Sequence, residues 1–352
     1  MNAHYLEILR ANEADRRGLF LSAAARLGTA VQHVEKDFWV CWTLDAMFNG
    51  LSSDSPRLLF KGGTALSKAF GLIDRFSEDI DITVFRDDLG QPATFLELEQ
   101  LSGKKRQRRL DAIKASCQAY ITGDFLRQLE ALLSDTMEQA GITRDNSIVV
   151  DEADPDRQTL LFWYPSALVD ARDYVQPAVR IEAGAKSALD PHQPTAVLPY
   201  VASDVPRLNL RVENITAVNP ERTFWDKVII LHGQRSWYER RGVLRADGHR
   251  ISRHYYDVYR LMRSDVGPRA LADRELGNDC AHHARMFFNS ADLDLAHAVP
   301  GTLALVPPKG MRDALRRDYN AMTGMIFGAV PSFDGIVTTI EEVEATANGA
   351  SQ

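Results

Sequence analysis

The stretch KGGTALSKAFGLIDRFSEDIDITVF, residues 61–85, decides the fold that we expect for this chain. It opens with a Lys-Gly-Gly turn, continues as a helical pattern from Thr64, and ends in an apolar run that starts at Asp79. A short apolar segment, residues 58–60, precedes it, so the predicted order is strand, helix, strand. The second strand should be buried, although acidic residues crowd its entrance.

The acidic residues at the start of this strand lie on two different faces of it. Because side chains alternate along a strand, Asp79 and Asp81 point to the same side, roughly 7 Å apart. Ile80 and Ile82 then face the core, and Glu78 falls on the face opposite to the two aspartates. Two neighbouring carboxylates repel each other unless a cation lies between them, and Mg²⁺ prefers such oxygen ligands together with substrate phosphates. We therefore predict that Asp79 and Asp81 hold Mg²⁺ and that a nucleotide supplies the remaining ligands.

The turn before the helix is suited to phosphate. Gly62 and Gly63 permit a tight turn whose backbone N–H groups, with the start of the following helix, can face an anion. Thr64 could cap that helix or donate to a phosphate oxygen. The patterns of a P-loop and of a Rossmann fingerprint are both absent from the stretch. We expect Lys61, Gly62, Gly63 and Thr64 to bind the nucleotide, the alternative being a solvated turn.

The whole chain predicts an α+β fold, with a mixed sheet and flanking helices followed by a mainly helical C-terminal domain. Further strands are expected at TLLFWY, residues 159–164, and AVRIEAGA, residues 178–185. The predicted parts are N-terminal helices over 1–50, a sheet domain over 51–210 with a helical insertion near 95–140, a helical domain over 211–343, and a flexible tail over 344–352.

Composition limits where the protein works and what it binds. Asp and Glu number 48 against 41 Lys and Arg, a net charge of -7, so any nucleic-acid site must be local. The cysteines, Cys41, Cys117 and Cys280, are few and odd in number, which favours a reducing compartment. No apolar stretch approaches the roughly 18 to 20 residues of a membrane span. We expect a cytoplasmic protein.

Taken together, the motifs resemble the nucleotidyltransferase family of AbiEii/AbiGii-type toxins, within the DNA polymerase β-like nucleotidyltransferase superfamily. Residues 61–85 are similar to the family's first motif. Three other segments match in order: VEKDFWVCWTL (34–44) is similar to the N-terminal segment, ERTFWDKVIIL (221–231) to the third motif, and RHYYDVYRL (253–261) to the fourth. The resemblance implies that residues 51–210 form a nucleotidyltransferase domain.

The resemblance also implies roles for single residues. Asp79 and Asp81 would hold Mg²⁺ beside the triphosphate, Lys227 would contact the nucleotide phosphates, and Asp257 would lie near the active site. Without the resemblance, Lys227 would be a solvated lysine on a helix, and Asp257 a helix acid bonded to a nearby arginine.

The family's second motif, lysine-x-aspartate, is represented here by Arg180-Ile181-Glu182, in which both charged positions keep their sign but change residue. By resemblance, Glu182 would complete the metal site or take the proton from an attacking hydroxyl. The alternative is a surface acid paired with Arg180 or Lys186.

The function implied is that of the toxin in a type IV-like toxin-antitoxin system of the kind used in phage defence, with a cognate antitoxin encoded nearby. It would transfer a nucleoside monophosphate from an NTP to an acceptor such as the 3′ end of tRNA. Two alternatives stay open: transfer to a protein hydroxyl, and binding of NTP as a sensing ligand without transfer.

Two basic clusters and one His/Cys cluster complete the candidates. The first basic cluster is KKRQRR, residues 104–109. The second consists of Arg235, Arg240, Arg241, Arg245, Arg250 and Arg253, together with Trp237 and Tyr238. Each basic cluster is either a contact surface for RNA or a solvated face. For Cys280, His282 and His283 we expect packing in the core and not metal binding, because no second cluster has ligand spacing.

Overall fold

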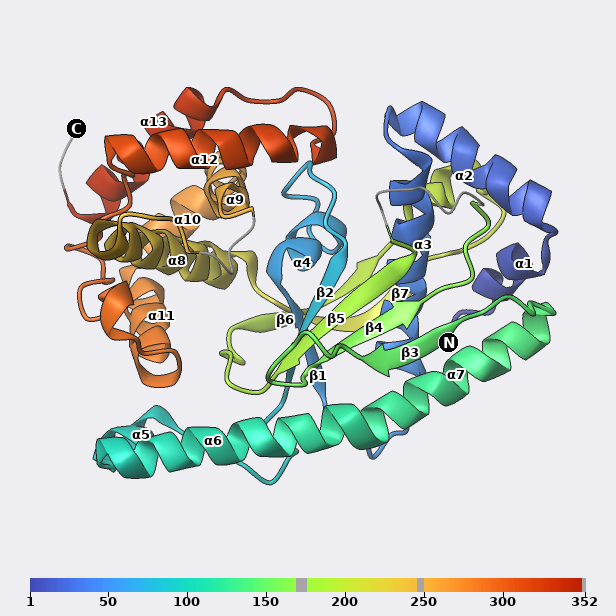
Figure 1. The fold of residues 1–352 in the computed structure, drawn as a ribbon, viewed down its shortest axis with the longest axis horizontal. Coiled ribbons are helices and arrows are strands. Elements are labelled where there is room, and N and C mark those ends of the chain that lie inside the picture. The colour runs from blue at the N-terminus through green and yellow to red at the C-terminus, as the bar shows by residue number, and fades with distance from the viewer. Residues whose placement is uncertain (169–175, 246–249, 350–352) are drawn as a thin grey trace. The chain divides into compact units, whose positions relative to one another are not determined.

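The computed structural model describes residues 1–168, 176–245 and 250–349, shown in Figure 1. The chain forms two compact units. The first comprises Met1–Ala69, Phe76–Ala93 and Gly103–Ala217, and the second comprises Phe70–Arg75, Thr94–Ser102 and Val218–Gln352. The sequence placed the change to a helical domain near residue 211, and the units divide after Ala217.

The first unit is built on a seven-stranded sheet. In spatial order its strands are β3 Ser147–Val150, β4 Thr159–Trp163, β5 Ala178–Gly184, β2 Asp79–Val84, β1 Leu58–Lys61, β7 Val212–Val218 and β6 His192–Val197. Strand β2 runs antiparallel to β1 and parallel to β5, so the sheet is mixed. The α+β prediction is confirmed, and the four predicted strands are β1, β2, β4 and β5, whereas β3, β6 and β7 were not expected.

One face of the sheet packs into the core of the first unit. Ile80 and Ile82 of β2 have no exposed surface. The rings of Trp39 and Trp42, on α3 Val31–Asp45, lie 5.6 and 5.4 Å from the ring of Phe162 on β4, measured between centroids. Large aromatic side chains bury much apolar area, which drives this packing. The aspartates that alternate with the two isoleucines therefore face the other side of the sheet, as predicted.

The remaining helices of the first unit surround the sheet. They are α1 His4–Arg10, α2 Glu13–Leu27, α4 Gly62–Lys68, α6 Gly103–Tyr120 and α7 Leu126–Ala140. A π-helical turn, Ile121–Phe125, joins α6 to α7, so residues 103–140 form one uninterrupted helical rod, which Figure 1 shows running along the sheet. Further short turns are π-helical Ala46–Gly50 after α3 and 3-10 helical Tyr200–Asp204.

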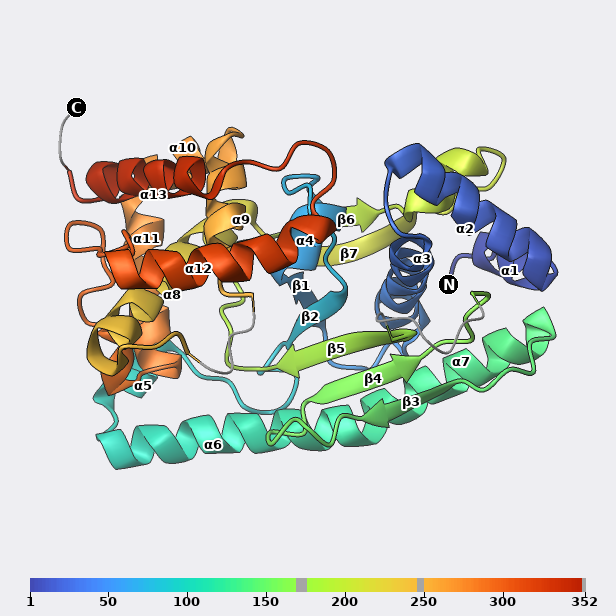
Figure 2. The same cartoon turned by 45° about the horizontal axis from the view of Figure 1, so that its top comes forward.

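The second unit is helical, as Figure 2 shows. Its helices are α5 Phe95–Gln100, α8 Pro220–Arg241, α9 Ser252–Met262, α10 Val266–Ala272, α11 Arg274–Phe287, α12 Lys309–Met322 and α13 Phe333–Ala347, with 3-10 turns at Ala291–Leu293 and Thr323–Met325. Pro220 begins α8, where its missing N–H costs no hydrogen bond, and Gly242 ends the helix in the left-handed conformation. In the described part of the chain, no helix is both long and apolar enough to cross a membrane.

The predicted flexible tail is wrong from Glu344 to Asn348. The carboxylate of Glu344 accepts hydrogen bonds from the backbone of the 305–306 turn, including one of 2.9 Å from Val306 N–H. The side chain of Asn348 accepts from the backbone of Leu303 at 2.9 Å. These long-range contacts keep the small, polar segment in helix α13 to Ala347, and the last three residues of the chain lie outside the described residues.

Candidate active site

Strand register gathers the predicted acidic residues on one face of the sheet in the first unit. Asp81 of β2 pairs with Glu182 of β5, and Asp79 pairs with Arg180. On the other side of β2, Asp81 pairs with Lys61 of β1. Directly paired residues of neighbouring strands point to the same face. Asp79, Asp81, Glu182 and Lys61 therefore share the face opposite to Ile80 and the tryptophans of α3.

Glu182 has a partner on its own strand. The Nε of Arg180 donates to Glu182 Oε1 at 2.9 Å, and Arg180 Nη2 lies 3.1 Å from Asp151 Oδ2. The ion pair that the sequence left open as an alternative is thus present. Register nevertheless puts Glu182 beside Asp81, so one residue has both a structural partner and a position at the site.

Gly62 determines how closely the turn approaches the aspartates. Its φ is +77°, and a Cβ at this position would lie 2.2 Å from Asp81 Oδ2. Only glycine therefore allows both the backbone conformation and the contact. Lys61 Nζ lies 3.7 Å from Asp81 Oδ1, and both side chains are 28% exposed. Gly63 is the second residue of α4, so residues 61–63 form one rim of the site.

Thr64 has a different role from the one expected. Lys61 is the N-cap of α4, which has no side-chain cap, so the predicted capping by Thr64 is wrong. The Thr64 hydroxyl is fully buried, donates to the carbonyl of Asp79, and lies 2.8 Å from Ser77 Oγ. The side chain thus joins α4 to the beginning of β2 at Asp79.

The second unit contains the other two predicted residues, and it brings them together. Lys227 Nζ on α8 lies 2.8 Å from Asp257 Oδ2 on α9. Arg75 binds the same carboxylate through two hydrogen bonds of 2.8 Å, from Nε and Nη2. All three side chains are buried. Lys227 is therefore not a solvated lysine, and Arg75 is a member of the cluster that the sequence did not reveal, because it lies 182 positions from Asp257.

The carboxyl of Asp257 is ionised despite its burial. Burial opposes the charge of Asp257, but Arg75 and Lys227 hold the pKa of this carboxyl well below its usual range. Burial lowers the pKa of Lys227, and Asp257 opposes that effect. Burial also lowers the pKa of His254, on the same helix as Asp257, so its imidazole is neutral at pH 7. The Nζ of Lys227 is thus held in one place by a carboxylate that stays charged.

The donor set available for a metal is small. Across residues 1–168, 176–245 and 250–349, no three His, Cys, Asp or Glu side chains lie close enough to hold a metal ion together. Asp79 and Asp81 are two carboxylates on the same face of β2, beside Glu182 on β5. Mg²⁺ usually binds to proteins through one or two carboxylates, with substrate phosphates and water supplying the rest.

Cys280 and His283 are buried as predicted, whereas His282 is only half-buried. Cys280 has no exposed surface. The ring of His282 lies 4.9 Å from the ring of Phe95 and its Nε2 lies 2.7 Å from Glu99. His283 stacks on Phe287, with 4.5 Å between ring centroids. The two histidines, Phe95 and Phe287 form an aromatic cluster between α5 and α11.

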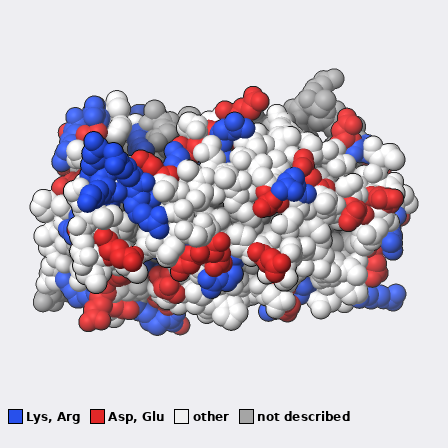
Figure 3. Space-filling model, turned by 90° about the horizontal axis from the view of Figure 1, so that it is seen from below, with Lys and Arg blue, Asp and Glu red and all other residues white. Residues whose placement is uncertain are grey.

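The basic cluster at residues 104–109 lies at the beginning of α6. Lys104, Lys105 and Arg108 are exposed, whereas Arg109 donates to the side chain of Gln91 and to the carbonyl of Pro92. Figure 3 shows Lys and Arg side chains gathered at the end of one face where α6 begins. This cluster is a charged, solvent-accessible surface.

The basic cluster around Trp237 is largely paired. Arg235 Nε lies 2.8 Å from Glu239, and Arg241 Nη2 lies 2.6 Å from Asp292. The guanidinium groups of Arg241 and Arg245 lie 5.4 and 5.6 Å from the centroid of the Trp237 ring. Acidic neighbours thus offset part of the positive charge here.

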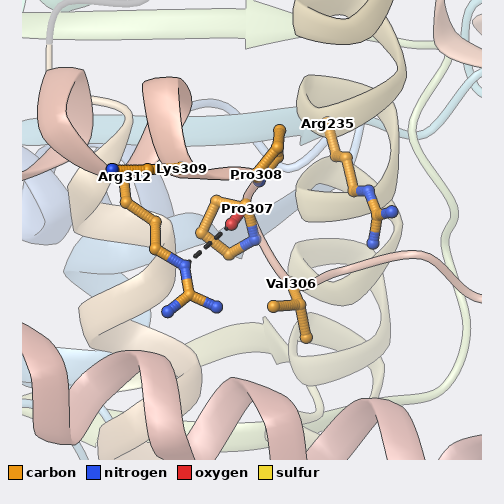
Figure 4. A pocket seen from close by; sticks show the side chains of 6 residues that line it. All are labelled: Arg235, Val306, Pro307, Pro308, Lys309 and Arg312. Atoms are coloured by element: carbon orange, nitrogen blue, oxygen red, sulfur yellow. Dashed lines mark hydrogen bonds between the residues drawn. The ribbon is translucent and has the colours of Figure 1, made fainter.

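The second unit also has an open cavity of about 420 Å³, shown in Figure 4. Its lining residues are Arg235, Val306, Pro307, Pro308, Lys309 and Arg312. Arg312 donates to the carbonyl of Pro307 at 2.9 Å and to Glu341 at 2.9 Å. Arg235 belongs to the second basic cluster, but none of the residues predicted to bind metal or nucleotide lines this cavity.

Comparisons with known proteins place this chain in a family. Among curated proteins no match was found. Among solved structures, the nucleotidyltransferase toxin MenT4 from Mycobacterium tuberculosis is similar over 96% of this chain and 99% of its own, with 14% identity and a TM-score of 0.43. The model of the family described as nucleotidyl transferase AbiEii toxin, type IV toxin-antitoxin system, matches residues 45–340, which include both aspartates of β2, Lys227 and Asp257. The match spans most of the chain and confirms the resemblance: the chain belongs to the AbiEii family of nucleotidyltransferase toxins.

Proposed function

We propose that this protein transfers a nucleoside monophosphate from an NTP to an acceptor hydroxyl, with Mg²⁺ as the cofactor. The observation that carries the proposal is the group of carboxylates on one face of the sheet, Asp79, Asp81 and Glu182. Gly62 lies beside them, so close that a Cβ on this residue would clash with Asp81. Family membership supports the same reaction class.

In the proposed reaction, the acceptor oxygen attacks the α-phosphorus of the NTP. A new phosphorus–oxygen bond forms, the bond between the α-phosphorus and the bridging oxygen breaks, and pyrophosphate leaves. The acceptor proton passes to a base, for which Glu182 is the candidate because it is a carboxylate beside Asp81. Its ion pair with Arg180 keeps that carboxylate oriented.

Asp79 and Asp81 are the residues that would hold Mg²⁺. Their oxygen donors suit that ion, which would offset the negative charge that develops on the leaving pyrophosphate. Lys61 and the backbone of Gly62 and Gly63 would contact the phosphates at the rim, together with the backbone of Thr64. The Thr64 side chain would only position Asp79.

Lys227 is proposed as a phosphate-binding cation and Asp257 as the residue that orients it. An ammonium group has three N–H donors, and Asp257 accepts from Lys227 through one oxygen at 2.8 Å. An ammonium held by a buried carboxylate needs little reorganisation to bind an anion, which is the general advantage of a preorganised site.

For the acceptor, we propose RNA, with the 3′ end of tRNA as the first candidate. Modification of that end would stop aminoacylation and hence translation, as a toxin should, and an antitoxin encoded nearby would oppose it. The cysteines Cys41, Cys117 and Cys280 are buried and unpaired, which fits the reducing cytoplasm where tRNA is used.

The test uses purified protein, Mg²⁺, each NTP labelled at the α-phosphate, and either total RNA or total cell protein. We expect label in RNA that disappears with Asp79→Ala, Asp81→Ala or EDTA, and mass spectrometry of the labelled RNA will locate the added nucleotide. Label in protein would assign the second acceptor class. Tight NTP binding with no label in either fraction would identify a sensor and contradict the proposal.

A further inference from the structure

Helix α3 has three consecutive buried charges, Glu35, Lys36 and Asp37, which are 2%, 6% and 2% exposed. Burying a charge is costly unless it is paired and hydrogen-bonded. Successive helix residues point about 100° apart. One helix can therefore present three adjacent charges to three different parts of the protein. We call these residues the α3 triplet.

Two members of the triplet bind the segment that carries the candidate active site. Lys36 Nζ lies 2.8 Å from Glu78 Oε2, and the two side chains are 8% and 18% exposed. Asp37 Oδ1 lies 2.6 Å from Lys68 Nζ, in a pair whose side chains are 3% and 4% exposed. Asp37 also accepts from the backbone N–H of Tyr200 at 2.6 Å, while the Lys68 ammonium lies 3.9 Å from the centroid of the Tyr200 ring.

The positions of these partners give the contacts their meaning. Lys68 is the last residue of α4, the helix that begins at Gly62. Glu78 immediately precedes Asp79, the first residue of β2. Between them, residues 70–75 belong to the second unit. The chain thus leaves the first unit after α4 and returns to it before β2. Helix α3 binds Lys68 just before the chain leaves and Glu78 just after the chain returns.

We propose that Lys36 and Asp37 are positioning residues of the nucleotidyl-transfer site. By binding Lys68 at the end of α4 and Glu78 just before β2, they fix the position of α4 relative to β2. This keeps the turn at Gly62 close to the aspartates. This inference rests on the proposed function, and it gives a role to charged residues of segment 34–44, for which the resemblance implied no role.

A role in stability alone would leave the properties of the folded enzyme unchanged. Catalysis is far more sensitive than folding to small displacements, because a shift of about 1 Å can cost about 100-fold in rate. Loss of the Lys36 ammonium would leave the Glu78 carboxylate without this partner, next to Asp79. We therefore expect the largest effect on the use of Mg²⁺, since Asp79 is one of its two proposed ligands.

The experiment compares Lys36→Met, Lys36→Arg and Glu35→Gln with wild type. Methionine keeps the length of the lysine side chain without its charge, and arginine keeps the charge. Glu35 is the matched control, because it is also buried on α3 but contacts the loop at Ser166 and Ala167, with distances of 2.6 Å to each. The measurements are the Mg²⁺ concentration at half-maximal transfer, kcat and KM for the NTP, and hydrogen exchange of residues 76–84 by mass spectrometry.

We expect Lys36→Met to raise the half-maximal Mg²⁺ concentration at least about tenfold and to speed exchange at the start of β2, while Lys36→Arg restores most of both and Glu35→Gln changes neither. Wild-type Mg²⁺ dependence in Lys36→Met, or equal impairment in Lys36→Arg, would overturn the proposal. If wild type transfers no nucleotide, the proposed function fails, and the exchange data alone decide whether Lys36 holds the segment.

Discussion

At the scale of single residues, Gly62 is the position where the backbone conformation determines how closely the chain approaches Asp81. A side chain there would need φ near +77° and would collide with Asp81. We predict that Gly62→Ala displaces the aspartate and lowers transfer at least about 100-fold. Gly28→Ala is the control, because Gly28 has φ of +65° but open space around it, so it adds backbone strain without touching the site. Transfer rates of the two variants, measured with matched folded protein, check the prediction, and equal rates would contradict it.

The buried cluster around Asp257 predicts unequal costs for its members. Asp257→Asn removes the carboxylate that Arg75 and Lys227 share, so we expect a loss of about 3 to 5 kcal/mol in the free energy of unfolding. Lys227→Met keeps the bidentate pair between Arg75 and Asp257, and should cost about 1 to 3 kcal/mol. Urea unfolding followed by circular dichroism measures both values. A larger loss for Lys227→Met would show that the lysine, and not the carboxylate, stabilises the cluster.

The sequence predicted local patterns at this scale and missed long-range partners. Asp79 and Asp81 could be assigned to one face because the period of a strand is two residues. Arg75 could not be connected with Asp257, since 182 positions separate them. The hydroxyl of Thr64 looked available for a cap or a phosphate, and only the fold shows that it donates to Asp79.

At the scale of elements, a central strand with one fully buried face could be recognised from the sequence. β2 contains Ile80, Ile82 and Val84, all without exposed surface, and its pattern was recognised. β3 and β6 are the edge strands of the sheet, and their sequences, SIVV and HQPTAV, are short or polar because an edge strand is covered less. In β7, Asn214 at φ of 62° interrupts the regular pattern.

The contact between α3 and the loop after β4 predicts a dependence of stability on pH. Burial raises the pKa of Glu35 from 4.5 to about 7, although Ser166 and Ala167 donate to its carboxylate. A carboxyl with a raised pKa binds its proton more tightly in the folded state, so its contribution is fully present below pH 4.5 and is lost as pH rises towards 7. The loss is at most on the order of 3 kcal/mol.

Glu35→Gln should remove this dependence, because glutamine stays neutral. Urea midpoints at pH 5 and pH 8 provide the measurement. Wild type should lose stability between pH 5 and pH 8. The variant should lose less over the same range. The same pH dependence in both proteins would mean that Glu35 does not titrate in this range.

At the scale of the whole molecule, a net charge of -7 requires that an RNA acceptor bind to a local basic surface. The exposed residues Lys104, Lys105 and Arg108 at the beginning of α6 supply one. We predict that their joint replacement by glutamine weakens RNA binding and reduces the slope of log Kd against log salt by about 2, because each RNA phosphate that the protein neutralises adds about 0.7 to that slope.

A matched control for that prediction removes three arginines that already have acidic partners. Arg127, Arg144 and Arg211 pair with Asp124, Glu13 and Glu213, and their replacement by glutamine changes the net charge equally. Filter binding across a salt series compares the two triple variants. Equal slopes for both would show that the beginning of α6 is only a solvated face.

The sequence also predicted the broad plan of the molecule, a sheet unit followed by a helical one, because the hydrophobic period changes near residue 211. It did not predict that residues 70–75 and 94–102 belong to the second unit. Such short segments have no distinctive amino-acid composition. Their place in the second unit depends on contacts with distant parts of the chain. For the same reason, the sequence showed the site residues as separate motifs: their contacts join distant parts of the chain.

The measurement that tests the central claim most directly follows both ends of the NTP in one reaction. Wild type and Asp81→Asn are incubated with Mg²⁺, total RNA and NTP labelled at either the α- or the γ-phosphate. We predict that wild type places α-label on RNA and releases γ-label as pyrophosphate in equal amounts, and that Asp81→Asn does neither while staying folded. Transfer by Asp81→Asn at the wild-type rate, or release of γ-label as inorganic phosphate without α-label on RNA, would contradict the account.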